Sequence, residues 1–302
     1  MEEKKSNVQL FPSKVRVVPN CKLAKITANR TEEQYADLLS GEKYSVIEKK
    51  KSKKRAEILS TYSITNAESY DGTDPLTFFD YCVLSVCISE QLAGNDFTTA
   101  AVILRGLTGK VGKSDAETFK NQRAAILNSI EKLMGTVIKI KNDEVNKEFG
   151  YNEGNAEIIT DTILPCRFVT ELINGQVIED TIYFYAPSPI FKVADQRNQI
   201  IRYDTELLDV PNQNNTPLVI TLKNYVMLRV MEIIKHKMTP TITLADIFKK
   251  CRIDASDKKY NMTREVKKVI DKFLEHLRQK DVIKSFNWKK QGTKIHDVSI
   301  TF

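Results

Sequence analysis

The sequence predicts an α+β protein in which one layout, two helices, a turn, a third helix and a β-hairpin, occurs twice. Two segments, beginning near residues 74 and 218, each open with a long apolar helix and close with strand-like alternation. A polar stretch bounded by prolines, PNQNNTP (residues 211–217), separates them. The length of 302 residues suits two domains, each large enough to bury a core.

The first helix is predicted within DPLTFFDYCVLSVCISEQLAGN (residues 74–95). Asp74 suits the N-cap, Pro75 the first helical position and Gly94 the C-terminal end. Between them, apolar and small residues recur at helical spacing, at Phe78, Cys82, Val86 and Ser89.

The next two helices follow within residues 97–134. Thr98 or Thr99 caps a short second helix, and Ser114 with Glu117 forms a capping box that starts a third helix ending near Met134. Between these helices, we expect three glycines to supply open or left-handed conformations: Gly106, Gly109 and Gly112. The end of a phosphate-binding loop, Gly-Lys-Ser, occurs at residues 112–114, but Leu107 stands where that loop requires glycine. We therefore expect these glycines to serve the turn between the two helices rather than nucleotide binding.

Strand patterns complete the first unit. Residues 136–141 and 156–164 are expected to form the closing hairpin, and Asn174-Gly175 predicts another hairpin turn within residues 166–185. This order is that of a winged helix-turn-helix domain, which we assign to residues 74–185. Residues 186–217 are predicted to be a connector with a further short hairpin.

The second unit, residues 218–302, repeats the pattern. Helices are expected at 220–238, after Thr243 as N-cap, and from about Asn261, followed by strands at about 282–288 and 294–302. Residues 1–73 are predicted to form a basic, partly flexible N-terminal arm. The arm contains KKKSKKR (residues 49–55), which is either a nucleic-acid-binding or nuclear-targeting stretch or a solvated surface.

Charge is concentrated at the C-terminal end. The whole chain carries a net charge of +7, but residues 220–302 hold 19 Lys and Arg against nine Asp and Glu, a net charge of +10. A domain with this excess of positive charge is suited to a polyanion, and double-stranded DNA is the partner that the sequence favours.

The third helix of the second unit is the main candidate for DNA contact. Val266, Ile270, Phe273 and Leu277 define a core face, which leaves a basic set on the other side. We predict that DNA-binding residues lie on this helix and near Gly292 at the hairpin tip; they are Arg264, Lys267, Lys268, Lys272, Lys289, Lys290 and Lys294.

In the first unit, Asn121 and Gln122 on the third helix are candidates for a secondary DNA contact, since amide side chains can pair with adenine. This unit is close to neutral, so its third helix serves either as a weaker DNA contact or as a protein-association surface.

Catalytic signals are lacking. The three histidines, His236, His276 and His296, form no metal-binding or nuclease motif, and the Asp and Glu residues form no metal-binding cluster. Five cysteines without a CxxC pair indicate reduced thiols in a cytoplasm, with Cys82 and Cys87 packed in the core. We expect no enzymatic activity, no cofactor, no metal and no membrane association, since the sequence contains neither an apolar span nor a secretory signal.

With these patterns in place, the chain resembles the theta-type plasmid replication initiators built from two tandem winged-helix domains (Rep_3-like). The resemblance covers residues 74–302 and depends on DPLTFFDYCVLSVCISEQLAGNDFTTAAVILRGLTG and ITLKNYVMLRVMEII. It implies binding to repeated origin sites, with main readout by the second domain, homodimerisation through the first, and contact with host replication proteins in the cytoplasm.

The leading hypothesis is thus a sequence-specific DNA-binding initiator of replication of a plasmid, phage or mobile element. A winged-helix transcriptional regulator shares every one of these residue arguments. A structural or assembly protein that uses the same scaffold for protein contacts is the third alternative.

Overall fold

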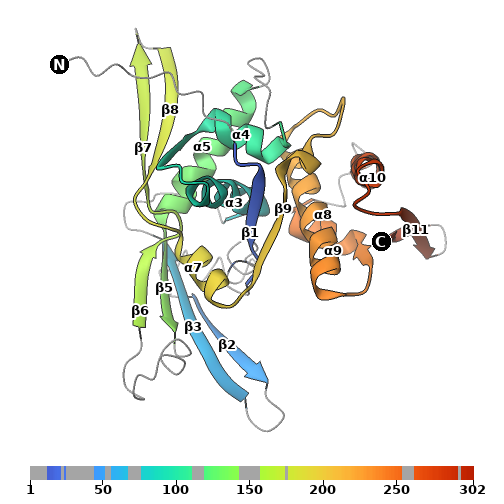
Figure 1. Ribbon diagram of the computed structural model, residues 1–302, viewed down its shortest axis with the longest axis horizontal. Helices are drawn as coiled ribbons and strands as arrows, with labels where there is room; N and C mark the ends of the chain where they lie inside the picture. Colours follow the sequence, from blue (N-terminus) through green and yellow to red (C-terminus); the bar gives the residue numbers. More distant parts are fainter. Residues whose placement is uncertain are drawn as a thin grey trace.

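The computed structural model describes residues 12–21, 24, 44–51, 56–66, 76–110, 119–142, 157–173, 176–253, 262–291 and 294–302. Over these residues the chain is a mixed α+β protein with several small antiparallel sheets (Figure 1). The helices form the centre, and two β-structures extend from it in opposite directions (Figure 1). The predicted α+β class is therefore confirmed.

The first unit has three helices and a hairpin. Its elements are α3 (Phe78–Leu92), β4 (Phe97–Thr99), α4 (Ala100–Thr108), α5 (Phe119–Gly135), β7 (Cys166–Ile173) and β8 (Gln176–Phe184). The short strand β4 pairs with β8, which gives the strand order β4-β8-β7. The hairpin predicted around Asn174-Gly175 is confirmed, since Ile173 pairs with Gln176 on either side of these two residues, which themselves lie outside the described residues.

The second unit follows the same order of elements. Its elements are α8 (Pro217–His236), β10 (Thr241–Thr243), α9 (Leu244–Lys250), α10 (Met262–Gln279), β11 (Ser285–Gln291) and β12 (Lys294–Thr301). The short strand β10 pairs with β12, so the order β10-β12-β11 matches that of the first unit. The two units thus share both their sequence of elements and the pairing of the short strand with the last strand.

A separate four-stranded sheet is inserted in the first unit. It contains β2 (Tyr44–Lys51), β3 (Ala56–Asn66), β5 (Thr136–Asn142) and β6 (Glu157–Thr162) in the order β2-β3-β5-β6. The predicted pairing of β5 with β6 is confirmed, but the short strand β4 joins the β7–β8 hairpin and not this one. Alternation in a sequence predicts that a strand forms, but not which distant strand it meets.

The N-terminal segment contributes to the core. The sequence predicts a loosely organised arm, whereas β1 (Val15–Pro19) pairs with β9 (Ile200–Asp204) in an antiparallel ribbon. The same pairing corrects the prediction of a separate short hairpin in the connector, which instead holds α7 (Pro189–Gln196), β9 and the short helix η1 (Thr205–Leu208). Val17 and Val18 are buried, so this strand is packed rather than free.

Helix α3 lies at the centre of the first unit and is buried on almost every side. It begins after Thr77, whose hydroxyl accepts from the Asp80 backbone N–H while the Asp80 carboxylate accepts from the Thr77 N–H, at 2.6 Å. The N-cap is therefore Thr77, three residues beyond Asp74, which lies outside the described residues. A helix that is apolar all round requires this central position.

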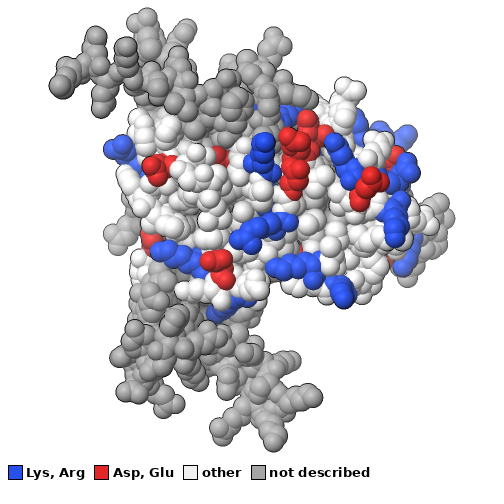
Figure 2. Space-filling view, in the orientation of Figure 1, with Lys and Arg blue, Asp and Glu red and all other residues white. Residues whose placement is uncertain are grey.

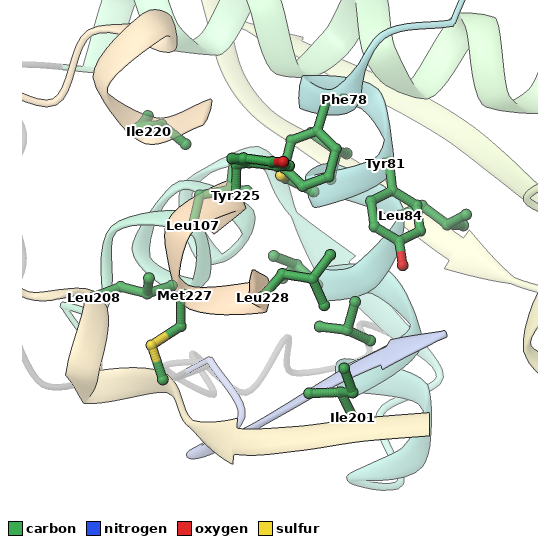
Figure 3. Packing of buried hydrophobic residues seen from close by; sticks show 14 of the residues in the cluster. Phe78, Tyr81, Leu84, Leu107, Ile201, Leu208, Ile220, Tyr225, Met227 and Leu228 are labelled. Carbon is green, nitrogen blue, oxygen red and sulfur yellow. The ribbon is translucent and has the colours of Figure 1, made fainter. Parts of the chain in front are cut away.

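The two units share one continuous core. Apolar side chains from α3, α4, α8, β9 and η1 pack together, among them Leu84, Leu107, Leu208 and Leu228 (Figure 3). The guanidinium of Arg16 is buried within this core and donates to the Cys82 carbonyl on α3, at 3.3 Å, and to the Asn224 side chain on α8, at 3.2 Å. Asn224 in turn donates to the Leu107 carbonyl, at 3.1 Å. Polar contacts therefore join α3, α4 and α8.

Two of the three glycines predicted to open the turn can be compared with the structure. Gly109 is left-handed, with φ of 83°, and ends α4 as expected. Gly106 is helical instead, and it is required because an added Cβ would lie 2.8 Å from a methyl group of Val86. Gly112 and the capping box of Ser114 lie outside the described residues.

We expect Gly109→Ala to destabilise the protein by at least about 2 kcal/mol more than Gly94→Ala. Both glycines have positive φ, so each substitution carries about the same cost of 1–2 kcal/mol for left-handed backbone. An added Cβ at Gly94 meets open space, whereas at Gly109 it would lie 2.3 Å from the backbone N of Asp209. Urea denaturation of the two variants measures the difference, and equal losses would contradict the close approach of α4 to η1.

Candidate nucleic-acid interface

Helix α10 separates an apolar face from a charged one, as the sequence predicts. The inward face packs in the core through Val266, Ile270, Phe273, Leu274 and Leu277, all of which are buried. On the outer face, Arg264, Lys268 and Lys272 are exposed. The burial of one face fixes the direction of the other, so these cations are presented to solvent.

The cations on the outer face differ in their partners. Among the described residues, Arg264 has no hydrogen-bond or ion-pair partner. Lys268 pairs with Glu265 at 2.7 Å, but both side chains are more than half exposed, and such a surface pair contributes little. Arg264 and Lys268 are thus available to an incoming polyanion.

Lys272 has a partner within the chain that the sequence does not predict. Its ammonium group donates to the Asn212 carbonyl in the polar segment between the units, at 2.6 Å. This contact holds the segment against α10. Lys272 remains exposed, but one of its donors is already used within the chain.

Lys267 belongs to a contact between α10 and the hairpin. It forms an ion pair with Asp271, one turn further along the helix, and its ammonium lies 5.2 Å from the centroid of the Trp288 ring on β11. The indole N–H of Trp288 donates to the other carboxylate oxygen of Asp271, at 2.5 Å. We call these three residues the helix–hairpin contact.

The hairpin β11–β12 carries the remaining predicted basic residues. Lys289 is exposed, and the strand register shifts between Lys289 and Lys290, which marks a β-bulge. Lys290 and Lys294 lie in the paired strands, opposite Ile295 and Gln291, while their side chains lie outside the described residues. A bulge near the tip changes the direction in which the strand and its side chains point.

Basic side chains gather over the second unit. Figure 2 shows Lys and Arg in blue at the right of the view, where α10 and β11 lie in Figure 1, with few acidic side chains among them. The excess positive charge of the C-terminal segment therefore lies on the surface of this unit.

The predicted secondary site on α5 is not brought together. Gln122 is buried, and its amide donates to the Asn215 carbonyl at 3.0 Å, so its side chain is not presented to solvent in this structure. The Asn121 side chain lies outside the described residues. The exposed residues of α5 that the structure describes are Ala124, Asn128 and Glu131, none of which is basic. Gln122 lies at the border between the apolar and polar faces of α5. Helical periodicity does not show that a distant segment, here the one that contains Asn215, covers this border.

The segment that covers Gln122 also meets a buried lysine. Lys223 on α8 donates to the Leu208 carbonyl, at 2.8 Å, and to the side-chain oxygen of Asn215, at 2.9 Å. Burial lowers the pKa of Lys223 to about 8, and nearby Asp209 opposes this shift. Asn215 thus connects the third helix of the first unit with the first helix of the second.

Sequence reasoning missed Asp271 and Trp288 as partners of the basic helix. An i, i+4 pair of Lys267 and Asp271 is visible in the sequence, and Trp288 is the single tryptophan of the chain. Their meeting depends on the register of the hairpin against α10, which periodicity does not give.

The described part of the chain contains no group of three or more His, Cys, Asp or Glu side chains that could hold a metal ion. None of its five cysteines forms a disulfide, four of them are buried as expected for Cys82 and Cys87, and burial raises the pKa of Cys166 and Cys251 to about 12. No helix in the described ranges has the length and apolar character that a membrane crossing needs.

Taken together, the geometry defines an α+β protein with two similarly ordered units, of which the second presents a basic helix and hairpin.

No family model and no curated protein sequence matches the chain. Among solved structures, the crystal structure of RctB domains 2-3 aligns with 93% of this chain and 96% of its own, at 13% identity and a TM-score of 0.45. A selenomethionine form of the same two RctB domains aligns with 94% of this chain and 99% of its own, at 11% identity and a TM-score of 0.40. Similarity at this level establishes neither a family nor a function.

We expect the stability advantage of the wild type over Lys223→Met to grow by about 1–2 kcal/mol between pH 7.5 and pH 9.5. The folded-state pKa of about 8 lies below the ordinary value of 10.5, so unfolding takes up a proton between these values. Rising pH therefore removes a cost of burying charge that the methionine variant never has. Urea denaturation at both pH values gives the difference, from which the other titrating groups cancel. A constant or shrinking difference would show that the Lys223 ammonium is not desolvated.

Proposed function

We propose that the chain binds double-stranded DNA sequence-specifically through tandem winged helix-turn-helix domains and initiates replication of a plasmid, phage or mobile element. The observation that carries the DNA-binding part is the arrangement of α10 and the β11–β12 hairpin. Arg264 and Lys268 stand exposed on the first turns of the helix, and Lys289 stands exposed on the adjacent hairpin.

The winged-helix assignment is supported by the order and pairing of elements. In each unit a first helix is followed by a short strand, two further helices and a hairpin whose last strand pairs with the short strand. In domains of this kind the third helix enters the major groove and the hairpin lies along the backbone. In the second unit these elements are α10 and β11–β12.

The side chains suit this docking. An arginine can donate two hydrogen bonds to a guanine edge, so Arg264 at the start of α10 is the best-placed base reader. Lys268 and Lys289 are suited to phosphate oxygens, which position the protein without reading sequence. Each phosphate contact releases counterions, and binding should therefore weaken steeply as salt is raised.

Initiation of replication is proposed from the resemblance to tandem winged-helix plasmid initiators. In those proteins the first domain also serves dimerisation. The exposed face of α5, with Ala124, Asn128 and Glu131, favours protein association over groove binding for the first unit. We therefore place the main DNA contact in the second unit, with a second copy of the chain and host replication proteins as further partners.

The double variant with Arg264→Ala and Lys268→Ala should lose affinity both for the DNA site that the protein prefers, selected as described below, and for random duplex DNA. The loss on the selected site should be at least tenfold larger than the loss on random DNA, because one good bidentate contact with a base discriminates by about 1–3 kcal/mol. Lys192→Ala with Arg202→Ala is the matched control, because these exposed residues on α7 and β9 carry the same charge outside the basic helix. Fluorescence anisotropy with both DNAs measures the two ratios. An equal loss on site and random DNA would leave only electrostatic attraction.

Selection of bound sequences from random duplex DNA provides the site and separates the functions. Direct repeats support an initiator, whereas a single short palindrome supports a transcriptional regulator. A reporter plasmid that carries the selected repeats and replicates only with this protein tests initiation itself. Absence of any DNA retardation at low salt would favour a structural or assembly protein.

A further inference from the structure

The helix–hairpin contact is the one place where the basic helix and its hairpin are joined by polar side chains in the described residues. Asp271 lies in the middle of the contact: one carboxylate oxygen pairs with Lys267 and the other accepts from the Trp288 indole N–H. Both oxygens of this carboxylate are therefore used, and all three side chains are partly buried.

A carboxylate on this face is a cost for a DNA-binding surface. Asp271 is on the same helix as Arg264 and Lys268, and a negative charge there repels phosphate. The contacts of Asp271 offer a role that offsets this cost. Asp271 links Lys267 on α10 to Trp288 on β11, two positions held on different elements.

We propose that Asp271 and Trp288 are positioning residues that hold the β11–β12 hairpin at a fixed angle to α10, and that Lys267 serves this contact rather than DNA readout. This inference depends on the proposed DNA-binding function. Trp288 is next to Lys289 and the β-bulge, so its attachment to α10 determines where the basic end of the hairpin is directed.

Fixing this angle matters because the helix and the hairpin must contact one duplex at the same time. When the two elements are already held in the bound arrangement, less conformational entropy is lost on binding. When they are free, either the helix or the hairpin can bind but the other must then be ordered.

The test compares two carboxylates on one helix. Asp271→Ala and Glu265→Ala each remove one negative charge from α10, and each releases a lysine, Lys267 or Lys268. Among the described residues, Glu265 forms no hydrogen bond or ion pair with the hairpin, so it is the matched control for charge. We expect Glu265→Ala to bind the selected site two- to threefold more tightly and Asp271→Ala to bind it about tenfold more weakly, despite the same gain in positive charge.

Tryptophan fluorescence gives a second readout that needs no DNA. Because Trp288 is the only tryptophan, emission and acrylamide quenching report this contact alone. We expect Asp271→Ala to increase quenching, Glu265→Ala to leave it unchanged, and Asp271→Asn to restore both quenching and affinity in part, since an amide oxygen still accepts from the indole.

The aromatic partner is tested by Trp288→Phe, which keeps an aromatic ring at this position, although a smaller one, and removes the N–H donor. It should weaken site binding as Asp271→Ala does, and a variant that combines Trp288→Phe with Asp271→Ala should bind no more weakly than either single variant, as for two members of one contact. Tighter binding by Asp271→Ala, equal to that of Glu265→Ala, would overturn the proposal. Failure of the wild type to bind any duplex would overturn the proposed function itself. Specific binding by the wild type that these variants leave unchanged would overturn only the positioning proposal.

Discussion

The burial of the Arg16 guanidinium is the constraint on which the arrangement of the two units depends. A charged group removed from water costs several kcal/mol unless its donors are satisfied. The Cys82 carbonyl on α3, the Asn224 side chain on α8 and the Tyr203 side chain on β9 provide partners for the guanidinium, whereas its buried Nε has no hydrogen-bond partner among the described residues. Because these partners come from both units and from the connector, the guanidinium is paired only when α3, α8 and β9 meet.

The polar segment between the units follows from this packing. Once α8 is held against α3, residues 211–217 pass close to α5, and their backbone groups need hydrogen-bond partners. Gln122, Lys223 and Lys272 reach this segment from three different helices. A stretch that looks like a free linker in the sequence is therefore a fixed connection, which restricts how the basic helix moves relative to the first unit.

Local features of the fold could be predicted from the sequence, whereas distant pairings could not. Thr99 and Thr243 cap their helices as expected, and the inward face of α10 follows helical spacing, because these features depend on neighbours within one or two turns. The β1–β9 ribbon joins residues far apart in the chain, and alternation carries no information about the partner. The same limit explains Gln122, whose exposure depends on a segment 93 residues away.

Net charge alone overstates the number of cations that DNA can use. Arg16 and Lys223 are buried and hold the units together, and Lys267 is neutralised by Asp271. Arg264 and Lys289 are exposed with no ion pair in the described residues, so their fields reach solvent undiminished. The counterions released on binding should therefore be fewer than the 19 Lys and Arg of the C-terminal segment suggest, because a cation already satisfied within the fold gains little from a phosphate. The basic residues thus fall into two groups. One group forms contacts within the fold, such as the contact between α10 and its hairpin, and a smaller group remains free to contact the duplex.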